Sequence, residues 1–328
     1  MIIKKIRKLQ RDPKLFFSDM IKKRINNKTA RPQFLKVKNG RYKYSIVSAV
    51  FGVEKYINQF IRSVKNQSLD FENNIEIIFI DDGSTDKSSE IIKKWAKKYP
   101  RNIFYYYKKN GGQASARNLG MTLATGDWIT FSDPDDSFDK NYFLSVDKSL
   151  SNENYDNITL LSCNYIFNIE GQGLKDTHPL RHRYQGGNKK ILVSDMKKDF
   201  QMAVNSAFFN RKQLISSGLK AKEDIKPNFE DGHFVASYLL KNMKRSVIFC
   251  SDAKYLYLKR SDQSSTLDGT LSKAQRYTDV VSNGYFDTLK NAKNKHGRVP
   301  EWLHNTIIYE LFWLIRYGLN NSARLAFL

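Results

Sequence analysis

The chain is poor in the features that stabilise small secreted domains or span membranes. Its 328 residues include only two cysteines, Cys163 and Cys250, both in apolar surroundings. A disulfide framework therefore has no support, and a reducing compartment fits better. The charged N-terminus lacks the apolar core of a signal peptide, and no stretch approaches the roughly 20 apolar residues of a membrane-spanning helix. We therefore expect the protein to work in the cytoplasm.

Positive charge is abundant and is concentrated near the N-terminus. The formal net charge is +22, and residues 1–43 hold 15 Lys and Arg against two Asp. Apolar residues lie among these cations at roughly helical spacing. Residues 1–40 are therefore predicted to form a basic amphipathic helical arm that binds anionic lipid or a partner. The alternative is a solvated helical arm that packs on its own domain.

Three carboxylates follow an apolar, β-prone segment at residues 129–136. They are Asp133, Asp135 and Asp136, in the run Ile-Thr-Phe-Ser-Asp-Pro-Asp-Asp. A strand that ends in this way projects hard oxygen ligands from a turn, which suits Mg²⁺ or Mn²⁺. The five histidines lack the spacing of a zinc site. The simpler alternative is an acidic surface turn, since Asp and Pro are common turn formers.

A second acidic strand end lies upstream. Residues 75–80 are predicted to form a buried strand that runs into Asp81 and Asp82, and a helical pattern follows over 88–98. In an open parallel sheet, the carboxyl ends of the strands form the ligand crevice. Both acidic loops are therefore expected to face one cleft.

A third strand and a helix are predicted between these two loops. Residues 103–107 indicate a strand, and residues 113–124 carry a helical pattern that Gly126 closes as a C-terminal stop. Small residues between the two let the backbone approach a ligand closely. Arg117 would lie in the first turns of the helix, near an N-terminus that suits anions, so we expect it to contact phosphate.

Four segments, in this order and spacing, resemble the family 2 glycosyltransferases of the GT-A fold. They are the strand at 45–51, the D-D-G-S-T-D loop at 81–86, the G-G-x-x-x-A-R-N segment at 111–118 and D-P-D-D at 133–136. The resemblance covers roughly residues 41–265. It implies an α/β fold with a mostly parallel, Rossmann-like central sheet flanked by helices. It also implies a nucleotide-sugar donor, a divalent metal, Mg²⁺ or Mn²⁺, and inversion at the anomeric carbon.

The same resemblance implies roles for residues near the nucleoside. It places Ala49 and Phe51 beside the base or the ribose, with Glu54 at the start of the next helix. Asp82 would accept a hydrogen bond from the nucleobase, most often uracil. Asp81 would support this loop.

Further roles concern the diphosphate and the metal. By the same likeness Arg117 would meet the diphosphate, and Asp135 would be the principal metal ligand. Asp133 would approach the ribose or the metal, with Asp136 as a further member of the group.

Glycosyl transfer also needs a base that removes the proton of the acceptor hydroxyl, and a carboxylate is the usual one. Glu230 and Asp231 follow the metal motif by about a hundred residues, where family members typically carry an acidic pair that opens a helix. The resemblance makes Asp231 the predicted base and Glu230 an acceptor-binding partner. The alternative is that both residues only stabilise the N-terminus of a helix over 234–240.

Residues 255–266 resemble the flexible segment with which the family closes over the donor phosphates and the metal. Lys259 or Arg260 would contact phosphate. Some members carry a metal-binding histidine here, and since this chain has none at that place, Asp262 or water would substitute. The alternative is a plain basic strand end followed by a polar loop.

Residues 171–198 are rich in Gly, Lys, Arg and His and lack a clear period, which predicts a loop and connector over the acceptor side. Four of its cations are candidates for binding a phosphate- or uronate-bearing glycan: Arg181, Arg183, Lys189 and Lys190. After residue 270 the pattern is helical, with an apolar cluster at 311–315. The sequence stops at residues 325–328 without a polar or glycine stop, so we expect it to end inside a larger protein or at a subunit contact.

We therefore expect an arm at 1–40, a GT-A domain at 41–268 and a helical region at 269–328. The interpretation is a metal-dependent inverting glycosyltransferase, peripherally attached to the inner face of the membrane. It would move a sugar, from a UDP-sugar, to a growing bacterial surface polysaccharide such as an anionic capsule or a teichoic-acid-like polymer.

Two other functions remain as alternatives. A sugar nucleotidyltransferase would want a glycine-rich phosphate loop after the first strand, which residues 52–54 do not supply. A non-enzymatic binder of polyanions or nucleic acid would leave the two acidic loops unexplained, because a phosphate-binding surface should avoid carboxylates. We therefore expect no nucleic-acid partner.

Overall fold

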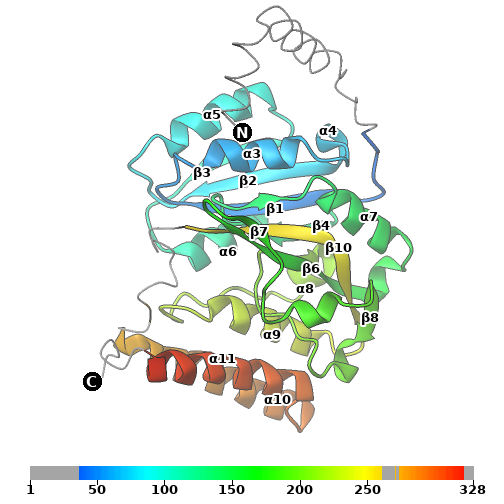
Figure 1. Ribbon diagram of the computed structural model, residues 1–328, viewed down its shortest axis with the longest axis vertical. Helices are drawn as coiled ribbons and strands as arrows, with labels where there is room; N and C mark the ends of the chain where they lie inside the picture. The colour runs from blue at the N-terminus through cyan, green and yellow to red at the C-terminus, as the bar shows by residue number, and fades with distance from the viewer. Residues whose placement is uncertain (1–36, 261–269, 271–272, 321–328) are drawn as a thin grey trace, which may run out of the picture. The chain divides into compact units, whose positions relative to one another are not determined.

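The computed structural model describes residues 37–260, 270 and 273–320, the side chains of 317–320 excepted (Figure 1). The predicted arm lies outside these residues apart from its last four positions, and so does Asp262. Contacts group residues Lys38–Leu328 into one compact unit. In the described part of the chain, no helix is both long and apolar enough to cross a membrane.

Four parallel strands form the first half of the sheet, in the order β3-β2-β1-β4. They are β1 (Tyr44–Val50), β2 (Ile75–Asp81), β3 (Ile103–Tyr107) and β4 (Trp128–Phe131). Three helices connect them: α3 (Ile57–Lys65), α5 (Ser88–Lys98) and α6 (Gln113–Leu123). The strands and helices predicted over this stretch are confirmed to within a few residues. Because the strands are parallel, their carboxyl ends meet at one edge of the sheet.

The second half of the sheet continues from β4 through β9 (Ala207–Asn210), β6 (Ile158–Ile169) and β10 (Ser246–Lys259) to β5 (Ser137–Phe138). The β4–β9 and β9–β6 pairs are antiparallel. The longest ladders, β6 with β10 and β1 with β2, are parallel. The predicted α/β fold with a mostly parallel central sheet is therefore confirmed.

The prediction of a plain loop over residues 171–198 is wrong in part. The segment forms β7 (Gly173–Lys175), which pairs with β6, and β8 (Lys189–Leu192), which pairs with β10. It also contains the short helices η2 (Arg181–Tyr184) and η3 (Val193–Asp195). Strands of three or four residues are too short to produce a readable period.

The remaining helices cover the sheet and its connections. They are α4 (Phe71–Asn74), α7 (Tyr142–Ser151), η1 (Tyr155–Asn157), α8 (Arg211–Ser216), α9 (Glu230–Lys241), η5 (Ala274–Arg276), the π-helix η6 (Val280–Phe286), α10 (Asp287–His296) and α11 (Glu301–Asn320). Figure 1 shows α3 and α5 on one side of the sheet and α9, α10 and α11 on the other. Between residues 274 and 320 the chain is mostly helical, as its pattern predicted.

The sheet separates two apolar cores because successive side chains of a strand point to opposite faces. On β1, Ile46 packs into the core with α3 and α7, while Val47 packs into the core with α6 and α9. The C-terminal helices join the second of these cores through Trp302 and Leu303, which are fully buried. The apolar cluster predicted at residues 311–315 of α11 is not fully buried, since Phe312 is 52% exposed. The last helices therefore pack against the same sheet face as α9.

Two local expectations need correction. The helix predicted to start at Glu54 begins at Ile57, because residues 54–56 form a turn. Its predicted packing face is confirmed, since all four apolar residues of that face are buried. Gly126 is not a left-handed helix stop. A Cβ atom at Gly126 would lie 2.8 Å from the carbonyl oxygen of Lys43, so close packing against β1 requires glycine there.

The contact between α6 and β1 yields a stability prediction. A Cβ atom at Gly120 would lie 2.3 Å from Cγ1 of Val47. Gly120→Ala should therefore lower the free energy of unfolding by about 1–3 kcal/mol, even though alanine has a higher intrinsic helix propensity than glycine. Urea denaturation measures this change, with Thr122→Ala on the exposed side of the same helix as the control. A Gly120→Ala protein as stable as wild type would contradict the packing described.

Candidate active site

A cleft of about 610 Å³ opens at the carboxyl ends of the parallel strands. Nine of the predicted site residues line it: Ala49, Phe51, Asp82, Arg117, Asp133, Asp135, Glu230, Asp231 and Arg260. The expectation that both acidic loops face one cleft is therefore confirmed. Glu54, Asp81 and Lys259 are not part of its lining.

Asp82 ties the loop after β2 to the loop before α6. Its carboxylate accepts hydrogen bonds from Nζ of Lys108 at 2.6 Å and from the backbone N–H groups of Gly111 and Gly112 at 2.9 and 2.8 Å. Gly112 has a φ of 90°, a left-handed conformation that glycine adopts without strain. The Lys108 ammonium group balances the charge of Asp82, and the three bonds fix the floor of the cleft.

Asp81 and Glu54 stabilise the loops around this floor. The Asp81 carboxylate accepts hydrogen bonds from the N–H of Ser84 at 2.8 Å and from the hydroxyl of Tyr105 at 2.7 Å. Glu54 accepts one from the N–H of Lys87 at 2.8 Å, where α5 begins. Both side chains accept hydrogen bonds from backbone N–H groups, so they stabilise the loops after β1 and β2 without lining the cleft themselves.

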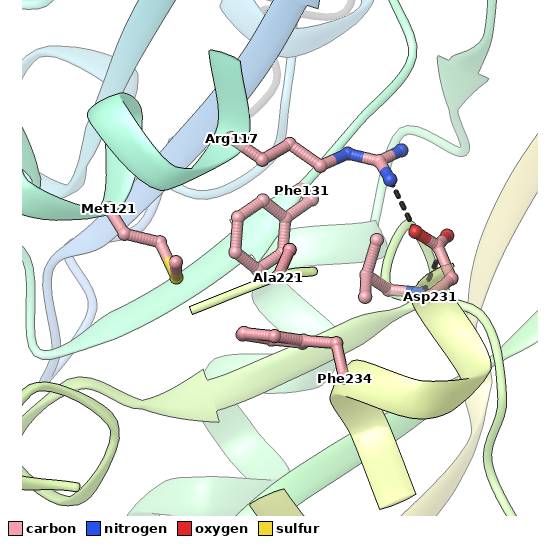
Figure 2. A pocket seen from close by; sticks show the side chains of 7 residues that line it. Arg117, Met121, Phe131, Ala221, Asp231 and Phe234 are labelled. Carbon is pink, nitrogen blue, oxygen red and sulfur yellow. Dashed lines mark hydrogen bonds and ion pairs between the residues drawn. The ribbon is translucent and has the colours of Figure 1, made fainter. Parts of the chain in front are cut away.

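Arg117 joins the two acidic walls of the cleft. Its guanidinium group, on α6, forms ion pairs with Asp231 at the start of α9 and with Asp133, the latter at 3.1 Å. Figure 2 shows the contact between Arg117 and Asp231, with the apolar side chains of Phe131 and Phe234 nearby. Only 5% of the Arg117 side chain is exposed. A guanidinium group removed from water needs such partners, and apolar neighbours strengthen their attraction.

The three carboxylates after β4 have different surroundings. Asp133 accepts hydrogen bonds from Gln113 at 2.8 Å and from Arg117. Asp135 pairs with Arg260 at the end of β10. Burial and the charge of Asp133 raise the pKa of Asp135, while Arg260 opposes this shift. Because Arg117 also pairs with Asp231, two arginines serve the three carboxylates of Asp133, Asp135 and Asp231.

Asp136 has a structural role in this arrangement. It is 2% exposed and accepts hydrogen bonds from the hydroxyl of Tyr255 at 2.6 Å and from the N–H of Leu258 at 2.7 Å. Burial, with the charges of Asp135 and Asp133, raises its pKa well above the usual range. Asp136 thus attaches the acidic turn to β10 and does not line the cleft.

Glu230 and Asp231 open α9, as predicted. Phe229, the residue before them, has a φ of 76°, and it is the one non-glycine residue of the described chain with a left-handed backbone. Burial and the charge of Asp231 raise the pKa of Glu230 to about 7. Burial also raises the pKa of Asp231, against the opposing charge of Arg117. The Asp231 carboxylate bonds to Arg117 on another helix, which a simple helix cap would not do.

The basic residues of the predicted closing segment lie in different places. Arg260 lines the cleft and stacks over the ring of Tyr56, 4.7 Å from its centroid. Lys259 lies over the ring of Phe167, 4.0 Å from its centroid, and does not line the cleft. Of the two candidates, Arg260 is therefore the one that can reach a ligand there.

The basic residues of segment 171–198 do not line the cleft. Arg183 is 3% exposed, and its guanidinium group bonds to the carbonyl of Phe200 and to Gln201, so its proposed contact with a glycan is wrong. Lys189 pairs with Asp199 and Lys190 with Glu153, each at 2.7 Å. Arg181 donates to a backbone carbonyl, that of Asp176.

Several lining residues were not predicted from the sequence. They include Gln113, Asn205, Asn228 and Tyr257, and one residue of the last helix, Glu310. Only Glu310 gave a signal, because it is the one carboxylate within the apolar stretch 302–315. The cleft is lined by six carboxylates and two guanidinium groups: Asp82, Asp133, Asp135, Glu230, Asp231 and Glu310 against Arg117 and Arg260. A negative cleft in a protein of net charge +22 indicates a specific requirement for a cation or for hydrogen-bond donors.

Comparisons with known proteins agree with this architecture. The chain is 32% identical over 270 residues to the minor teichoic acid biosynthesis protein GgaA of Bacillus subtilis, an alignment that covers 82% of this chain and 58% of GgaA. The chain thus spans little more than half the length of that relative.

Two solved structures share the fold. Staphylococcus aureus TarS 1–349 in complex with UDP-GlcNAc matches with a TM-score of 0.61 and 18% identity, over 80% of this chain and 69% of that one. The mannosyltransferase PcManGT of Pyrobaculum calidifontis, in complex with GDP-Man and Mn²⁺, matches with a TM-score of 0.56 and 14% identity, over 86% and 76%. The family model described as glycosyl transferase family 2 matches residues 45–217, more than half of the sequence. The resemblance found in the motifs is thereby confirmed, and the chain belongs to glycosyl transferase family 2.

Proposed function

We propose that this protein transfers a sugar from a nucleotide-sugar donor, a UDP-sugar, to a hydroxyl group of a bacterial surface polysaccharide. The observation that carries the proposal is the cleft in which Arg117 bridges Asp133 and Asp231. Family membership supports the reaction class. The name of GgaA favours a polymer of the teichoic-acid type, with capsule as the other surface polymer.

Donor binding requires that a diphosphate enters a cleft with more carboxylates than cations. Like charges at close range repel strongly in a partly buried site, so Arg117 and Arg260 alone would not compensate both the diphosphate and the carboxylates. A divalent cation would compensate the remaining negative charge. Nucleotide binding would therefore depend on Mg²⁺ or Mn²⁺, and the PcManGT complex with Mn²⁺ gives a precedent on the same fold.

Asp133 and Asp135 fit such a cation. Their oxygens are hard ligands, and burial, with the charge of Asp133, raises the pKa of Asp135, so a bound cation would stabilise its ionised form. Among the described residues, no three His, Cys, Asp or Glu side chains are placed so that they could hold one metal ion, so phosphate and water oxygens would supply the other ligands. When bound, the cation would neutralise charge on the leaving diphosphate.

The nucleoside would lie at the other wall of the cleft. Phe51 is 61% exposed although it lines the cleft, and an exposed aromatic ring there suits stacking on a base. Ala49 and Asp82 border the same region. Arg260, which pairs with Asp135, would turn to the diphosphate when the donor binds, and Arg117 would contact the diphosphate while it keeps its ion pair with Asp231.

Asp231 is the proposed base. Its carboxylate would take the proton from the acceptor hydroxyl while that oxygen attacks the anomeric carbon and the nucleoside diphosphate leaves, which inverts the configuration. Burial raises the pKa of Asp231 and so makes it a stronger base than an exposed aspartate. Arg117 holds the carboxylate in a fixed orientation. Glu230, its neighbour, would bind the acceptor.

Membrane attachment is a separate part of the proposal. The cations of residues 1–43 would bring the enzyme to the anionic inner face of the cell membrane, where a surface polymer is built on the cytoplasmic side. Those residues lie almost wholly outside the described part of the chain.

The metal dependence can be measured by titrating UDP into the protein by calorimetry, with Mn²⁺ and with chelator. We expect chelator, or Asp135→Asn, to weaken UDP binding by at least about tenfold, because the charge repulsion is then uncompensated. Asp156→Asn, an exposed aspartate outside the cleft, is the control. Unchanged affinity in chelator and in Asp135→Asn would exclude the proposed metal role.

The role of the base predicts that Asp231→Asn lowers transfer by about 10²- to 10⁴-fold while UDP binding with Mn²⁺ survives. Glu230→Gln should act mainly through a higher KM for the acceptor. The donor is chosen by screening nucleotide sugars for metal-dependent hydrolysis by the wild-type protein. Transfer of its sugar to isolated teichoic acid is then measured in each variant, and thermal melts confirm folding. If Asp231→Asn is active and Glu230→Gln is dead, the two roles are reversed, and if both are active the base lies elsewhere.

The ionisation of Glu230 predicts a stability effect. Its folded pKa of about 7 lies above the ordinary value of 4.5, so the folded protein loses stability as pH rises through this interval. At pH 8, Glu230→Gln should be more stable than wild type by about 1–3 kcal/mol, and the difference should shrink towards pH 5. Urea denaturation at both pH values tests this, with the exposed Glu90→Gln as control. A difference that is independent of pH would argue against a buried, ionised Glu230.

A further inference from the structure

The last helix contributes a side chain to the cleft, which is unexpected for a region that follows the family-matched segment by about 90 residues. Glu310 of α11 lines the cleft, and its Oε2 accepts a hydrogen bond from the hydroxyl of Tyr285 at 3.2 Å. The Tyr285 ring packs edge-on against the ring of Phe229, with 4.6 Å between the centroids. Phe229 directly precedes Glu230, so this chain of contacts connects α11 to the acidic start of α9.

The C-terminal helices also fix the position of Phe229. A Cβ atom at Gly232 would lie 2.6 Å from the Phe229 ring, and one at Gly284 of η6 would lie 2.9 Å from it. The ring is thus held between α9 and a π-helix, an element that occurs frequently at functional sites. A left-handed phenylalanine is maintained only where its surroundings determine it closely.

Asn228 adds an independent sign that a ligand binds at this end of the cleft. Its side chain is 8% exposed and lines the cleft, yet its Oδ1 has no hydrogen-bond partner among the described residues. A buried acceptor without a donor is costly, and a ligand that carries a donor would satisfy it. Asn228 lies next to Phe229 in the chain, on the same side of the cleft as Glu230 and Asp231.

The polar groups at the Asn228 end of the cleft favour one class of ligand. Glu230, Asp231, Glu310 and the Asn228 oxygen all accept hydrogen bonds, and three of these groups are carboxylates. The hydroxyl groups of a sugar or polyol are matching donors. Burial raises the pKa of Glu310, while the charge of Arg276, which does not line the cleft, opposes this shift, and Arg117 pairs with Asp231. A phosphate or carboxylate on the ligand would therefore meet mainly hydrogen-bond acceptors and like charge here, and would bind less well than a hydroxyl group.

We propose that the C-terminal helices complete an acceptor subsite in which Glu310, with Asn228, binds the hydroxyl groups of an uncharged sugar or polyol unit. The inference rests on the proposed function and names the substrate class of the same cleft. Any phosphate of the acceptor polymer then lies beyond the unit that occupies the subsite. Glu310 is an acceptor-binding residue, and Tyr285 is a positioning residue that orients it.

The test compares matched ligands that differ only in charge. Methyl glucoside and methyl galactoside, each beside its methyl uronoside, are titrated by NMR into the full chain with UDP and Mn²⁺ present. Wild type should bind the uncharged glycosides at least about tenfold more tightly than the uronosides. Glu310→Gln should reduce this preference to threefold or less, since it keeps the shape but removes the charge. Glu301→Gln, on the same helix but outside the cleft, should behave as wild type.

Other outcomes overturn the inference. If wild type binds no uncharged glycoside, or binds the uronosides equally well, the subsite does not have this chemistry. If Glu310→Gln folds and keeps the full preference, Glu310 only supports Tyr285. Should Glu310→Gln fail to fold, Asn228→Ala replaces it, because it removes the other proposed acceptor of sugar hydroxyl groups; it should weaken binding of the uncharged glycosides by at least about threefold, and unchanged binding would overturn the subsite. UDP binding in the same samples reports on the proposed function separately.

Discussion

The ion pairs of Arg117 are the interaction on which the rest of the cleft depends. Its buried guanidinium group binds Asp133, after the parallel strands, and Asp231, at the start of α9 beyond the antiparallel half of the sheet. Without the charge of Arg117, the carboxylates of Asp133, Glu230 and Asp231 would repel one another in a partly buried space. One arginine therefore connects the two walls, and its single positive charge faces two carboxylates; under the proposed function, a cation that binds with the donor would supply the missing positive charge.

The arrangement at the start of α9 costs stability, because it buries carboxylates and holds a strained backbone. Glu230 has a pKa of about 7 because it is buried beside Asp231, and Phe229 holds a left-handed backbone just before it. Packing elsewhere compensates, since Gly232, Gly284 and Tyr285 enclose the Phe229 ring. Strain and perturbed ionisation at one loop are typical of functional sites. The strained loop at Phe229 and Glu230 therefore needs packing from helices that follow the family-matched segment.

Much of this could be predicted from local patterns. Strands and helices with clear periodicity, such as β2 and the buried face of α3, were predicted correctly, and parallel pairing required that the acidic ends of β2 and β4 converge. Long-range partners could not be predicted. Nothing in the sequence indicates that Arg183 is buried among carbonyls, that Gly126 packs on β1, or that Asn228 lines the cleft. These positions depend on how distant segments pack, which periodicity does not encode.

The central claim is that the carboxylates of the cleft accept a nucleotide diphosphate only with a divalent cation between them. The most direct measurement is a crystal structure of the complex with UDP and Mn²⁺, with anomalous scattering used to locate manganese. The account predicts an anomalous peak in contact with Asp135 and with the diphosphate of UDP, and Arg260 released from Asp135. A diphosphate held by Arg117 and Arg260 with no manganese beside it would contradict the account.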